Sequence, residues 1–333
     1  MARVAVVGGG AFGTATACVI RRSGHDVVLW AREPDVVEDV NTRGVNSAFL
    51  AGIPLVPGLR ATGDFAEAVA GAALVVLAVP AQFVRSIASQ LRPMLPEGMP
   101  VVSCAKGVER ESCALMPEVI AEALPASTIA VLSGPALARE IAADLPTGVT
   151  LACESAQVGQ FLARTIGTPR FRTYLSEDVI GVAIGGAMNN VLGVACGIVE
   201  GRKLGQDARA TLLTRGLAEM AALGRAKGAK LRTFMGLSGV GDLTLTCNDL
   251  HARNTSLGVA IGQGQNAHDI IAGRKVVTEG FFSVQAVAAL ARRLGIEMPI
   301  SQALDEVLNH DADVDGAIGR LLARPYDFEW GMG

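Results

Sequence analysis

The sequence predicts an α/β protein, in which an N-terminal doubly wound parallel sheet is followed by an all-helical C-terminal domain. Short β-branched runs alternate with helical patterns through the first half of the chain, as expected for strands joined by crossover helices. After about Asp178 the strand signals vanish and long helical patterns take over. The chain has 333 residues, of which 50% are hydrophobic, so it is long enough for two domains.

The first elements form a βαβ unit, with a strand at Arg3–Val7, a helix at Ala11–Arg22 and a second strand at residues 27–30. Each later run is almost continuously apolar, which is typical of parallel strands covered on both faces. These further strands are expected at residues 74–79, 101–103, 129–132 and 148–152.

We expect the domain boundary near residues 176–178, which gives a dinucleotide-binding domain at 1–177 and a helical substrate domain at 178–333. The segment 179–199 is apolar enough to suggest a membrane span. Asn189, Asn190 and the glycines within it favour a buried core helix instead. Residues 207–227 are expected to form another helix, with Asp207 as its N-cap.

Gly8, Gly10 and Gly13 form a GxGxxG pattern directly after the first strand and at the start of the first helix. In this context Gly8 permits a tight turn, Gly10 lets the backbone approach a pyrophosphate, and Gly13 allows close packing of helix on strand. Ala11 and Phe12 lie at the helix start, where N–H groups attract an anion. A glycine turn that serves only chain geometry is the alternative, but the context favours a Rossmann-like dinucleotide site.

Arg32 follows the second strand, at the place where an acidic residue would contact the ribose of NAD. A guanidinium suits the 2′-phosphate of NADP, so NADP is favoured as the cofactor. NAD stays possible because Glu33 lies beside Arg32.

Composition argues against several other classes of function. The formal net charge is −3 and no basic tract occurs, so we expect no nucleic acid partner. Six cysteines without a CxxC pair indicate reduced, buried thiols, and the N-terminus lacks the pattern of an export signal, so we expect a cytoplasmic protein. No GxSxG, HExxH or clustered metal ligands appear, and the four histidines, of which only His251 is near a site motif, do not suit a hydroxy-acid dehydrogenase.

Several separate motifs resemble the bacterial NAD(P)-dependent glycerol-3-phosphate dehydrogenase family. The longest read ATLLTRGLAEM at 210–220 and GLSGVGDLTLTC at 236–247, and shorter ones lie at 103–107, 133–140 and 253–254. The resemblance implies hydride exchange between NAD(P)H and dihydroxyacetone phosphate or sn-glycerol 3-phosphate, feeding phospholipid synthesis. The expected partner is therefore a small phosphorylated substrate, and the apolar helical half suggests a homodimer.

The resemblance also implies roles for individual residues. Lys106 would lie close to the nicotinamide and the substrate, and Arg253 with Asn254 would grip the phosphate, with Arg253 also reaching the cofactor. Residues implied on the substrate side are Gly134, Ala136, Asn190, Asp242, Thr246 and Ala252, with Asp242 also catalytic; those on the cofactor side are Ala138, Val277 and Glu279.

The chain departs from the family at three positions. The family motif GALKNV carries the usual general acid or base, whereas this chain reads GAMNNV, which puts Asn189 in place of the lysine. Ala136 stands where the family usually has Ser or Thr, and Ala252 stands where Ser is usual. Since a positioned acid contributes about 100- to 10,000-fold to such reactions, a weakened or diverged NAD(P)-binding paralogue is the alternative to an active dehydrogenase.

Overall fold

The computed structural model describes residues 1–250, 252–274 and 277–325. It divides into two compact units. Unit 1 comprises Met1–Lys106 and Met116–Ala183, and unit 2 comprises Gly107–Leu115 and Ile184–Gly333. The stretch Gly107–Leu115 therefore belongs with the helical unit, although it lies between two strands of unit 1 in the sequence.

Unit 1 contains one eight-stranded sheet with the order β3-β2-β1-β4-β5-β6-β7-β8. All neighbouring strands are parallel except β6 and β7, so the predicted parallel sheet is confirmed apart from this pair. Only the short helix α6 (Ala138–Ala142) lies in the connection from β6 to β7. The strands are β1 Arg3–Val7, β2 Asp26–Trp30, β3 Arg60–Thr62, β4 Leu74–Leu77, β5 Pro100–Ser103, β6 Thr128–Ser133, β7 Thr147–Cys153 and β8 Phe171–Ser176.

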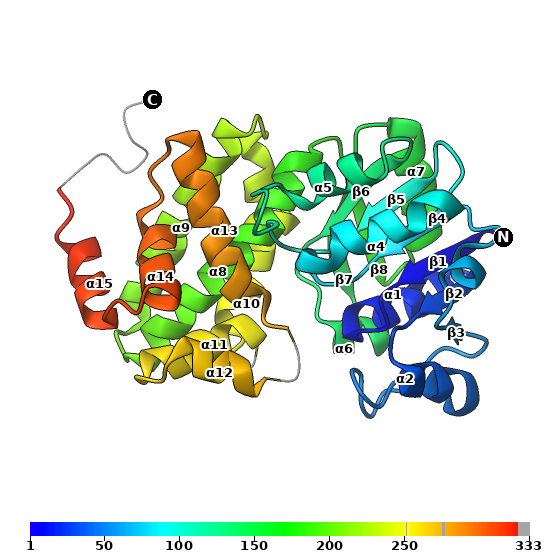
Figure 1. Cartoon of the computed structure of the whole chain (residues 1–333), viewed down its shortest axis with the longest axis horizontal. Coiled ribbons are helices and arrows are strands. Elements are labelled where there is room, and N and C mark those ends of the chain that lie inside the picture. Colours follow the sequence, from blue (N-terminus) through cyan, green and yellow to red (C-terminus); the bar gives the residue numbers. More distant parts are fainter. Residues whose placement is uncertain (251, 275–276, 326–333) are drawn as a thin grey trace. The chain divides into compact units, whose positions relative to one another are not determined.

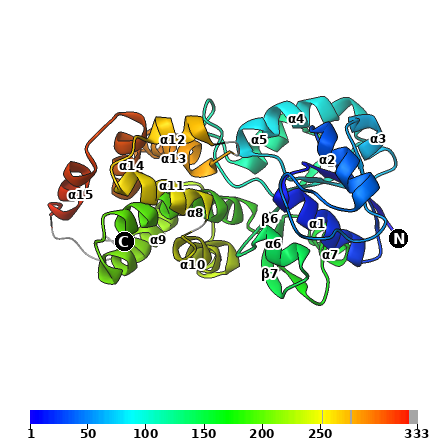
Figure 2. The ribbon, with the colours of Figure 1, turned by 90° about the horizontal axis from the view of Figure 1, so that it is seen from below.

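Helices cover both faces of this sheet, which confirms the doubly wound architecture. In Figure 2 helices α4 and α5 lie on one side of the strands, and α1, α6 and α7 lie on the other. The helical segments are α1 Ala11–Arg22, α2 Pro34–Glu38, η1 Asp39–Arg43, α3 Phe65–Val69, η2 Ala81–Phe83, α4 Val84–Leu91, η3 Arg92–Met94, α5 Met116–Ala123 and α7 Ala156–Ile166.

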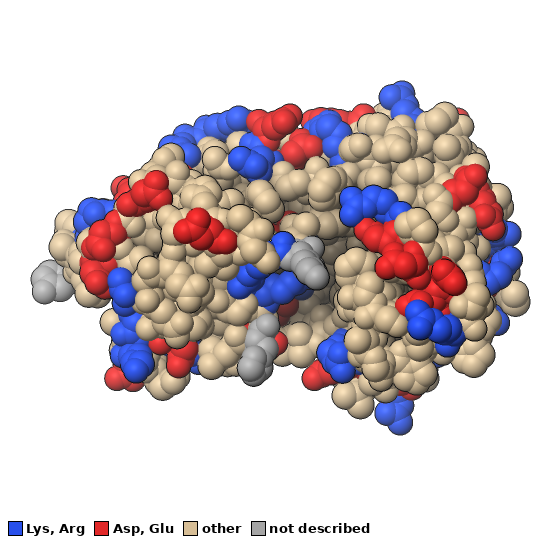
Figure 3. All heavy atoms as spheres, turned by 60° about the horizontal axis from the view of Figure 1, so that its bottom comes forward, with Lys and Arg blue, Asp and Glu red and all other residues tan. Residues whose placement is uncertain are grey.

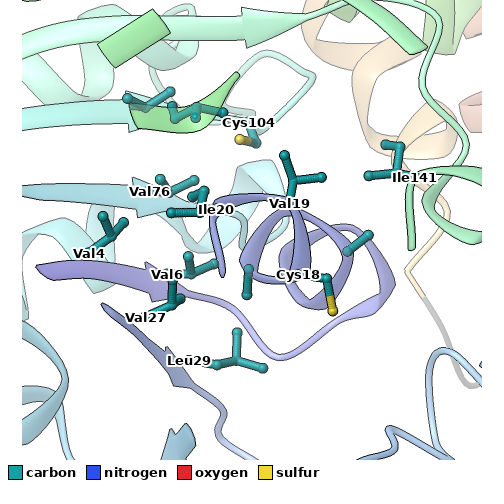
Figure 4. Packing of buried hydrophobic residues seen from close by; sticks show 14 of the residues in the cluster. Val4, Val6, Cys18, Val19, Ile20, Val27, Leu29, Val76, Cys104 and Ile141 are labelled. Carbon is teal, nitrogen blue, oxygen red and sulfur yellow. The ribbon is translucent and has the colours of Figure 1, made fainter. Parts of the chain in front are cut away.

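The core of unit 1 forms where α1 packs on the central strands. Val4 and Val6 point to the same face of β1 because side chains alternate along a strand, and they meet the buried side of α1 (Figure 4). Other members of this cluster are Cys18, Val19, Ile20, Val27, Leu29 and Val76. All six cysteines are free and buried, as the sequence predicts.

Unit 2 is helical from Ile184 through the described residues, so the predicted helical half is confirmed (Figure 1). Its segments are α8 Val179–Gly201, which starts in unit 1, α9 Gln206–Ala226, η4 Leu231–Met235, η5 Leu237–Gly241, α10 Asp242–Asn248, α11 Arg253–Gly262, α12 Ala267–Gly273, α13 Glu279–Leu294, α14 Pro299–Asn309 and α15 Val314–Leu322. The predicted N-cap of α9 is wrong: Gly205 occupies that position with a φ of 94°, and Asp207 lies in the first turn, where a carboxylate still favours the helix dipole.

Helix α8 is the one helix in the described residues that is long and apolar enough to cross a membrane, yet 94% of its apolar 18-residue window is buried inside the protein. Its glycines permit close packing. A Cβ at Gly197 would lie 2.1 Å from the Thr255 carbonyl oxygen of α11, and one at Gly193 would lie 2.8 Å from the Thr246 side chain of α10. The prediction of a core helix is therefore confirmed.

The surface carries charges of both signs. On the face shown in Figure 3, basic and acidic side chains are interspersed among uncharged ones. Such a distribution suits a small anionic ligand held in a local pocket better than a long polyanion.

Candidate functional site

The glycine loop between β1 and α1 has the geometry that a dinucleotide needs. Gly8 has a φ of 131°, and a Cβ there would lie 2.6 Å from the Ala78 carbonyl oxygen. A Cβ at Gly13 would lie 1.9 Å from the Gly8 carbonyl oxygen, so helix and strand approach as predicted. A Cβ at Gly10 would meet nothing within 4 Å, which means that protein packing does not itself require glycine there.

Gly10 is also the N-cap of α1, and no side chain caps this end. The first N–H groups of the helix, including those of Ala11 and Phe12, have no partners within the helix and attract an anion. Open space at Gly10 together with an uncapped helix start fits the pyrophosphate of NAD(P).

Asn46 anchors this loop, although nothing in the sequence analysis singled it out. Its side chain is fully buried, and Nδ2 donates to the Gly9 carbonyl oxygen and to Thr14 Oγ1, both at 2.8 Å. Asn46 Oδ1 accepts from the Phe49 N–H at 3.1 Å. One side chain therefore fixes the middle of the glycine loop from a segment more than thirty residues away.

Arg32 lies beyond the end of β2 and is 75% exposed. Its Nε and Nη2 donate to Glu33 Oε1 at 3.1 and 2.8 Å. Because such an exposed ion pair contributes little, the guanidinium can exchange this partner for a phosphate. Trp30, the last residue of β2, stacks on Phe65 with ring centroids 4.2 Å apart.

Lys106 and Gly134 lie together beyond the ends of two neighbouring strands, β5 and β6. Lys106 Nζ donates to the Gly134 carbonyl oxygen at 3.2 Å. Gly134 has a φ of 146°, so a side chain at this position would be strained. Ala136 and Ala138 pack against the nearby core. This is the edge of an open α/β sheet at which ligands bind.

In unit 2, three helices share a hydrogen-bonded chain. Asn254 Nδ2 on α11 donates to Asn190 Oδ1 on α8 at 2.8 Å, and the Gly280 N–H on α13 donates to Asn254 Oδ1 at 2.9 Å. Two residues implicated in substrate binding by the resemblance are therefore in direct contact. The Asn254 amide therefore links α8, α11 and α13 through its Nδ2 and Oδ1 atoms.

Asn189 faces the short helix η5. It is 1% exposed, its Nδ2 donates to the Ser238 carbonyl oxygen at 3.2 Å, and its Oδ1 has no hydrogen-bond partner among the described residues. Asp242, which is also buried, begins α10. Thr246 lies one turn later, and its carbonyl oxygen accepts from Thr255 Oγ1 at 2.8 Å.

Two arginines meet at the N-terminus of α11. Arg253 begins the helix after Ala252, which provides no side-chain cap, and Arg253 Nη1 donates to the Val277 carbonyl oxygen at 2.9 Å. Arg274 donates to the Arg253 carbonyl oxygen at 2.7 Å, to Thr278 Oγ1 at 3.0 Å and to Ser256 Oγ at 3.1 Å. Glu279 follows at the start of α13.

Burial, and then the charge of Arg253, lower the pKa of Arg274. In the described part of the chain, the hydrogen bonds of Arg253 and Arg274 go to backbone carbonyl and hydroxyl oxygens. Two neighbouring cations beside an uncapped helix start favour a dianion such as a phosphate. The sequence analysis predicted Arg253 and missed Arg274, because only the fold brings the segment after α12 to this helix end.

The remaining points concern histidine and metal ligands. His251 is outside the described residues. Within the part that the structure describes, no three His, Cys, Asp or Glu side chains gather as metal ligands.

Comparison with known proteins decides the family. Models described as the N-terminus and the C-terminus of NAD-dependent glycerol-3-phosphate dehydrogenase match residues 3–159 and 178–319. The chain belongs to this dehydrogenase family. A glycerol-3-phosphate dehydrogenase (NAD(P)+) of Parvibaculum lavamentivorans is 52% identical over 98% of both chains, and that of Rhodospirillum rubrum is 51% identical over 98% of this chain and 94% of its own.

Solved structures agree with the assignment. Glycerol-3-phosphate dehydrogenase from Coxiella burnetii has a TM-score of 0.92 and 36% identity, over 97% of this chain and 99% of its own. A ketopantoate reductase family protein from Ralstonia eutropha, at 19% identity and a TM-score of 0.62 over 92% and 97% of the chains, shares the fold alone. The family resemblance is thereby confirmed. The comparisons give no support to a diverged binding protein without turnover.

Proposed function

We propose that the chain is an NAD(P)-dependent glycerol-3-phosphate dehydrogenase, which exchanges a hydride between NAD(P)H and dihydroxyacetone phosphate to form sn-glycerol 3-phosphate. The observation that carries this proposal is the agreement with relatives of that name along 98% of the chain. The reaction class is an oxidation or reduction at one carbon of a three-carbon polyol phosphate.

The cofactor supplies the hydride when it is bound. We assign its binding mainly to a domain of residues 1–177, where the glycine loop and α1 hold the pyrophosphate and Arg32 the 2′-phosphate, so that NADPH is preferred to NADH. The proposed contacts are Gly8, Gly10, Ala11, Phe12, Gly13, Arg32, Lys106, Ala138, Arg253, Val277 and Glu279.

Residues 178–333 would form the substrate domain. The Arg253–Arg274 pair supports phosphate binding there, because the N–H groups that start α11 and two guanidinium groups all attract a dianion. We assign the remaining substrate contacts to Lys106, Gly134, Ala136, Asn190, Asp242, Thr246, Ala252 and Asn254.

Reduction of the ketone builds negative charge on its oxygen. The Asn189 amide can donate a hydrogen bond to this oxygen and so stabilise it, but it has no proton to give at neutral pH. Lys106 carries an ammonium group, and we assign the proton transfer to it.

The phosphate site is tested by NADPH oxidation with dihydroxyacetone phosphate and with unphosphorylated dihydroxyacetone. We expect turnover to depend on the phosphate. Arg274→Gln should raise KM for the phosphorylated ketone by about 10- to 100-fold, since a hydrogen bond to a charged group contributes about 1.5–3 kcal/mol. Arg202→Gln is the control, because Arg202 donates to the Gly262 carbonyl oxygen and pairs with Asp315, away from this site. Equal rates with both ketones would refute the proposed substrate.

We also propose that the protein acts as a homodimer in the cytoplasm. The support is indirect, since it comes from the apolar helical half and from six free, buried cysteines that suit a reducing compartment. Sedimentation equilibrium of the purified chain measures the subunit number.

A further inference from the structure

The stretch between Lys106 and helix α5 forms a hairpin that belongs to unit 2. We call Gly107–Leu115 the hairpin. Val108 and Leu115 are fully buried and form an antiparallel bridge at its base. Lys106 is the residue directly before it in the chain. The backbone that carries the Lys106 amine is therefore continuous with a structure of the helical unit.

The hairpin has a set of hydrogen bonds of its own. The Glu109 N–H donates to the Ala114 carbonyl oxygen, and the Cys113 N–H donates to the Glu109 carbonyl oxygen, both at 2.9 Å. The Ser112 hydroxyl donates to a Glu109 carboxylate oxygen, and the Ala114 N–H donates to Ser112 Oγ at 3.1 Å. These bonds give the hairpin its shape, so its contacts with other elements determine where it lies.

Arg293 of α13 binds the backbone of the hairpin near its tip. Its Nη1 donates to the Ser112 carbonyl oxygen, and its Nη2 donates to the Glu111 carbonyl oxygen at 3.4 Å. A guanidinium presents its N–H groups in one rigid plane, which suits two neighbouring acceptors. Because both acceptors are main-chain oxygens, this contact fixes the path of the chain itself.

A second contact with α13 comes from Arg110 of the hairpin. Its Nε donates to Gln285 Oε1 at 2.9 Å, and its guanidinium carbon lies 5.5 Å from the centre of the Phe282 ring. Phe282, Gln285 and Arg293 recur at helical spacing along α13, so they lie on one face of this helix. One helix face therefore contacts the hairpin at two places.

Helix α13 is a firm support for these contacts. Its opposite side is packed into the core of the helical unit, with Val284 and Val287 among the buried residues. In its first turn the Gly280 N–H donates to Asn254 Oδ1 at 2.9 Å. The same helix thus contacts the hairpin that follows Lys106 and an amide that we assign to the substrate.

We propose that Arg293 is a positioning residue, which fixes the hairpin and through it the amine of Lys106. This inference rests on the proposed proton transfer from Lys106. A lysine amine sits on a flexible four-carbon stem, so Lys106 Nζ stays beside the Gly134 carbonyl oxygen only while the backbone at the start of that stem is fixed. A displacement of about 1 Å at a reacting group can lower a rate by about 100-fold.

Kinetics of Arg293→Ala with NADPH and dihydroxyacetone phosphate test this proposal. We expect kcat to fall by about 10- to 100-fold. The KM for the ketone and the Kd for NADPH should change little, because Arg293 is in neither assigned binding site. Arg293→Lys should recover part of the loss, since an ammonium group can still donate to one carbonyl oxygen. Arg320→Ala, which removes an exposed partner of Glu306, is the control and should leave kcat unchanged.

Lys106→Met separates positioning from a general effect on the fold. If Arg293 acts through Lys106, Arg293→Ala should lower kcat much less in the Lys106→Met background than in the wild type. A general disturbance of the helical unit would lower kcat in both backgrounds alike. An equal loss in the two backgrounds, or an unchanged kcat in Arg293→Ala, would overturn the proposal.

Acetylation of the Lys106 amine by acetic anhydride gives a readout that needs no turnover. Mass spectrometry measures its extent relative to the exposed Lys230 in the same sample. We expect Arg293→Ala to raise this ratio several-fold, because the amine leaves the Gly134 carbonyl oxygen more often. Equal ratios in the wild type and Arg293→Ala would overturn the proposal. A wild type without turnover would refute the proposed reaction, and the ratio would still decide whether Arg293 positions Lys106.

Discussion

Asn46 shows how one buried amide shapes a ligand loop from a distance. Its three hydrogen bonds reach the Gly9 carbonyl oxygen, Thr14 Oγ1 and the Phe49 N–H. Without this side chain, the Gly9 carbonyl oxygen and the Thr14 hydroxyl lose these bonds and keep their mutual bond of 3.3 Å. The loop that receives the pyrophosphate would then be less well defined.

We expect Asn46→Ala to raise the Kd for NADPH about tenfold or more, because the lost bonds are buried and each contributes about 1 kcal/mol or more. The kcat at saturating NADPH should change much less, since Asn46 holds the loop and does not touch the reacting atoms. Asn41→Ala is a matched control, because Asn41 makes two hydrogen bonds to the Ala61 backbone. Equal effects of the two variants on Kd would contradict a specific role for Asn46.

Glu219 is a buried carboxyl that accepts hydrogen bonds from the Ile300 and Ser301 N–H groups and from Ser301 Oγ, at the start of α14. Burial raises the pKa of Glu219 from 4.5 to about 7, against the lowering effect of these bonds and of Arg215. The folded protein therefore holds a proton that the unfolded chain releases. The stabilisation from this group is complete below pH 4.5 and is lost as the pH rises through about 7.

Glu219→Gln should accordingly flatten the decrease in Tm between about pH 4.5 and about 7 relative to the wild type, because glutamine is neutral throughout. Thermal unfolding in a pH series measures this difference. Glu97→Gln at an exposed position is the control. A parallel pH profile for the wild type and Glu219→Gln would rule out this titration.

The sequence predicts residues of local motifs better than residues whose partners are brought to them only by the fold. Gly8, Gly10 and Gly13 are predictable because their roles depend on neighbours within one turn, and the structure gives each the expected space. Asn46 and Arg274 act through partners that are far away in the sequence or in irregular segments. No local pattern could have indicated them.

At the scale of elements, the packing of α8 on α11 depends on glycines in both helices. Gly193, Gly197 and Gly201 recur every four residues on α8, and Gly258 and Gly262 do so on α11. A Cβ at Gly258 would lie 2.0 Å from the Val194 carbonyl oxygen, and one at Gly262 2.7 Å from that of Ile198. The two backbones therefore touch along this seam.

Gly197→Ala should lower the free energy of unfolding by about 1–3 kcal/mol, because the new Cβ collides with backbone that cannot move independently. Gly319→Ala is the opposite control, since Gly319 lies within α15 and a Cβ there meets nothing within 4 Å. It should raise the free energy of unfolding by up to about 1 kcal/mol through helix propensity. Urea titration measures both, and a Gly197→Ala protein as stable as the wild type would contradict the packing argument.

Some strands escaped the sequence analysis for physical reasons. Strand β3 has only three residues, and β8 lies at the edge of the sheet with several exposed side chains, so it lacks a continuous apolar run. The direction of β7 depends on the connection after β6 and not on the composition of β7, which explains why a parallel strand was expected there. The central strands were predictable because both of their faces are buried.

At the scale of the whole molecule, the order of strands and helices predicted the architecture, since each half of the chain repeats one pattern along its length. The family also followed from short motifs in the N-terminal half and two long motifs in the C-terminal half, and the comparisons confirm it. The consequence of Asn189 could not be predicted in this way. Its chemistry depends on which other group delivers the proton to the substrate.

The most direct test is the rate of NADPH oxidation with dihydroxyacetone phosphate, measured by absorbance for the wild type and for Asn189→Lys at matched concentration over a range of pH. We predict many turnovers by the wild type, because Lys106 supplies the proton. The variant should raise kcat by up to about 100-fold, because the lysine adds an acid beside the developing charge. If neither protein consumes NADPH in the presence of this ketone, the proposed reaction is wrong.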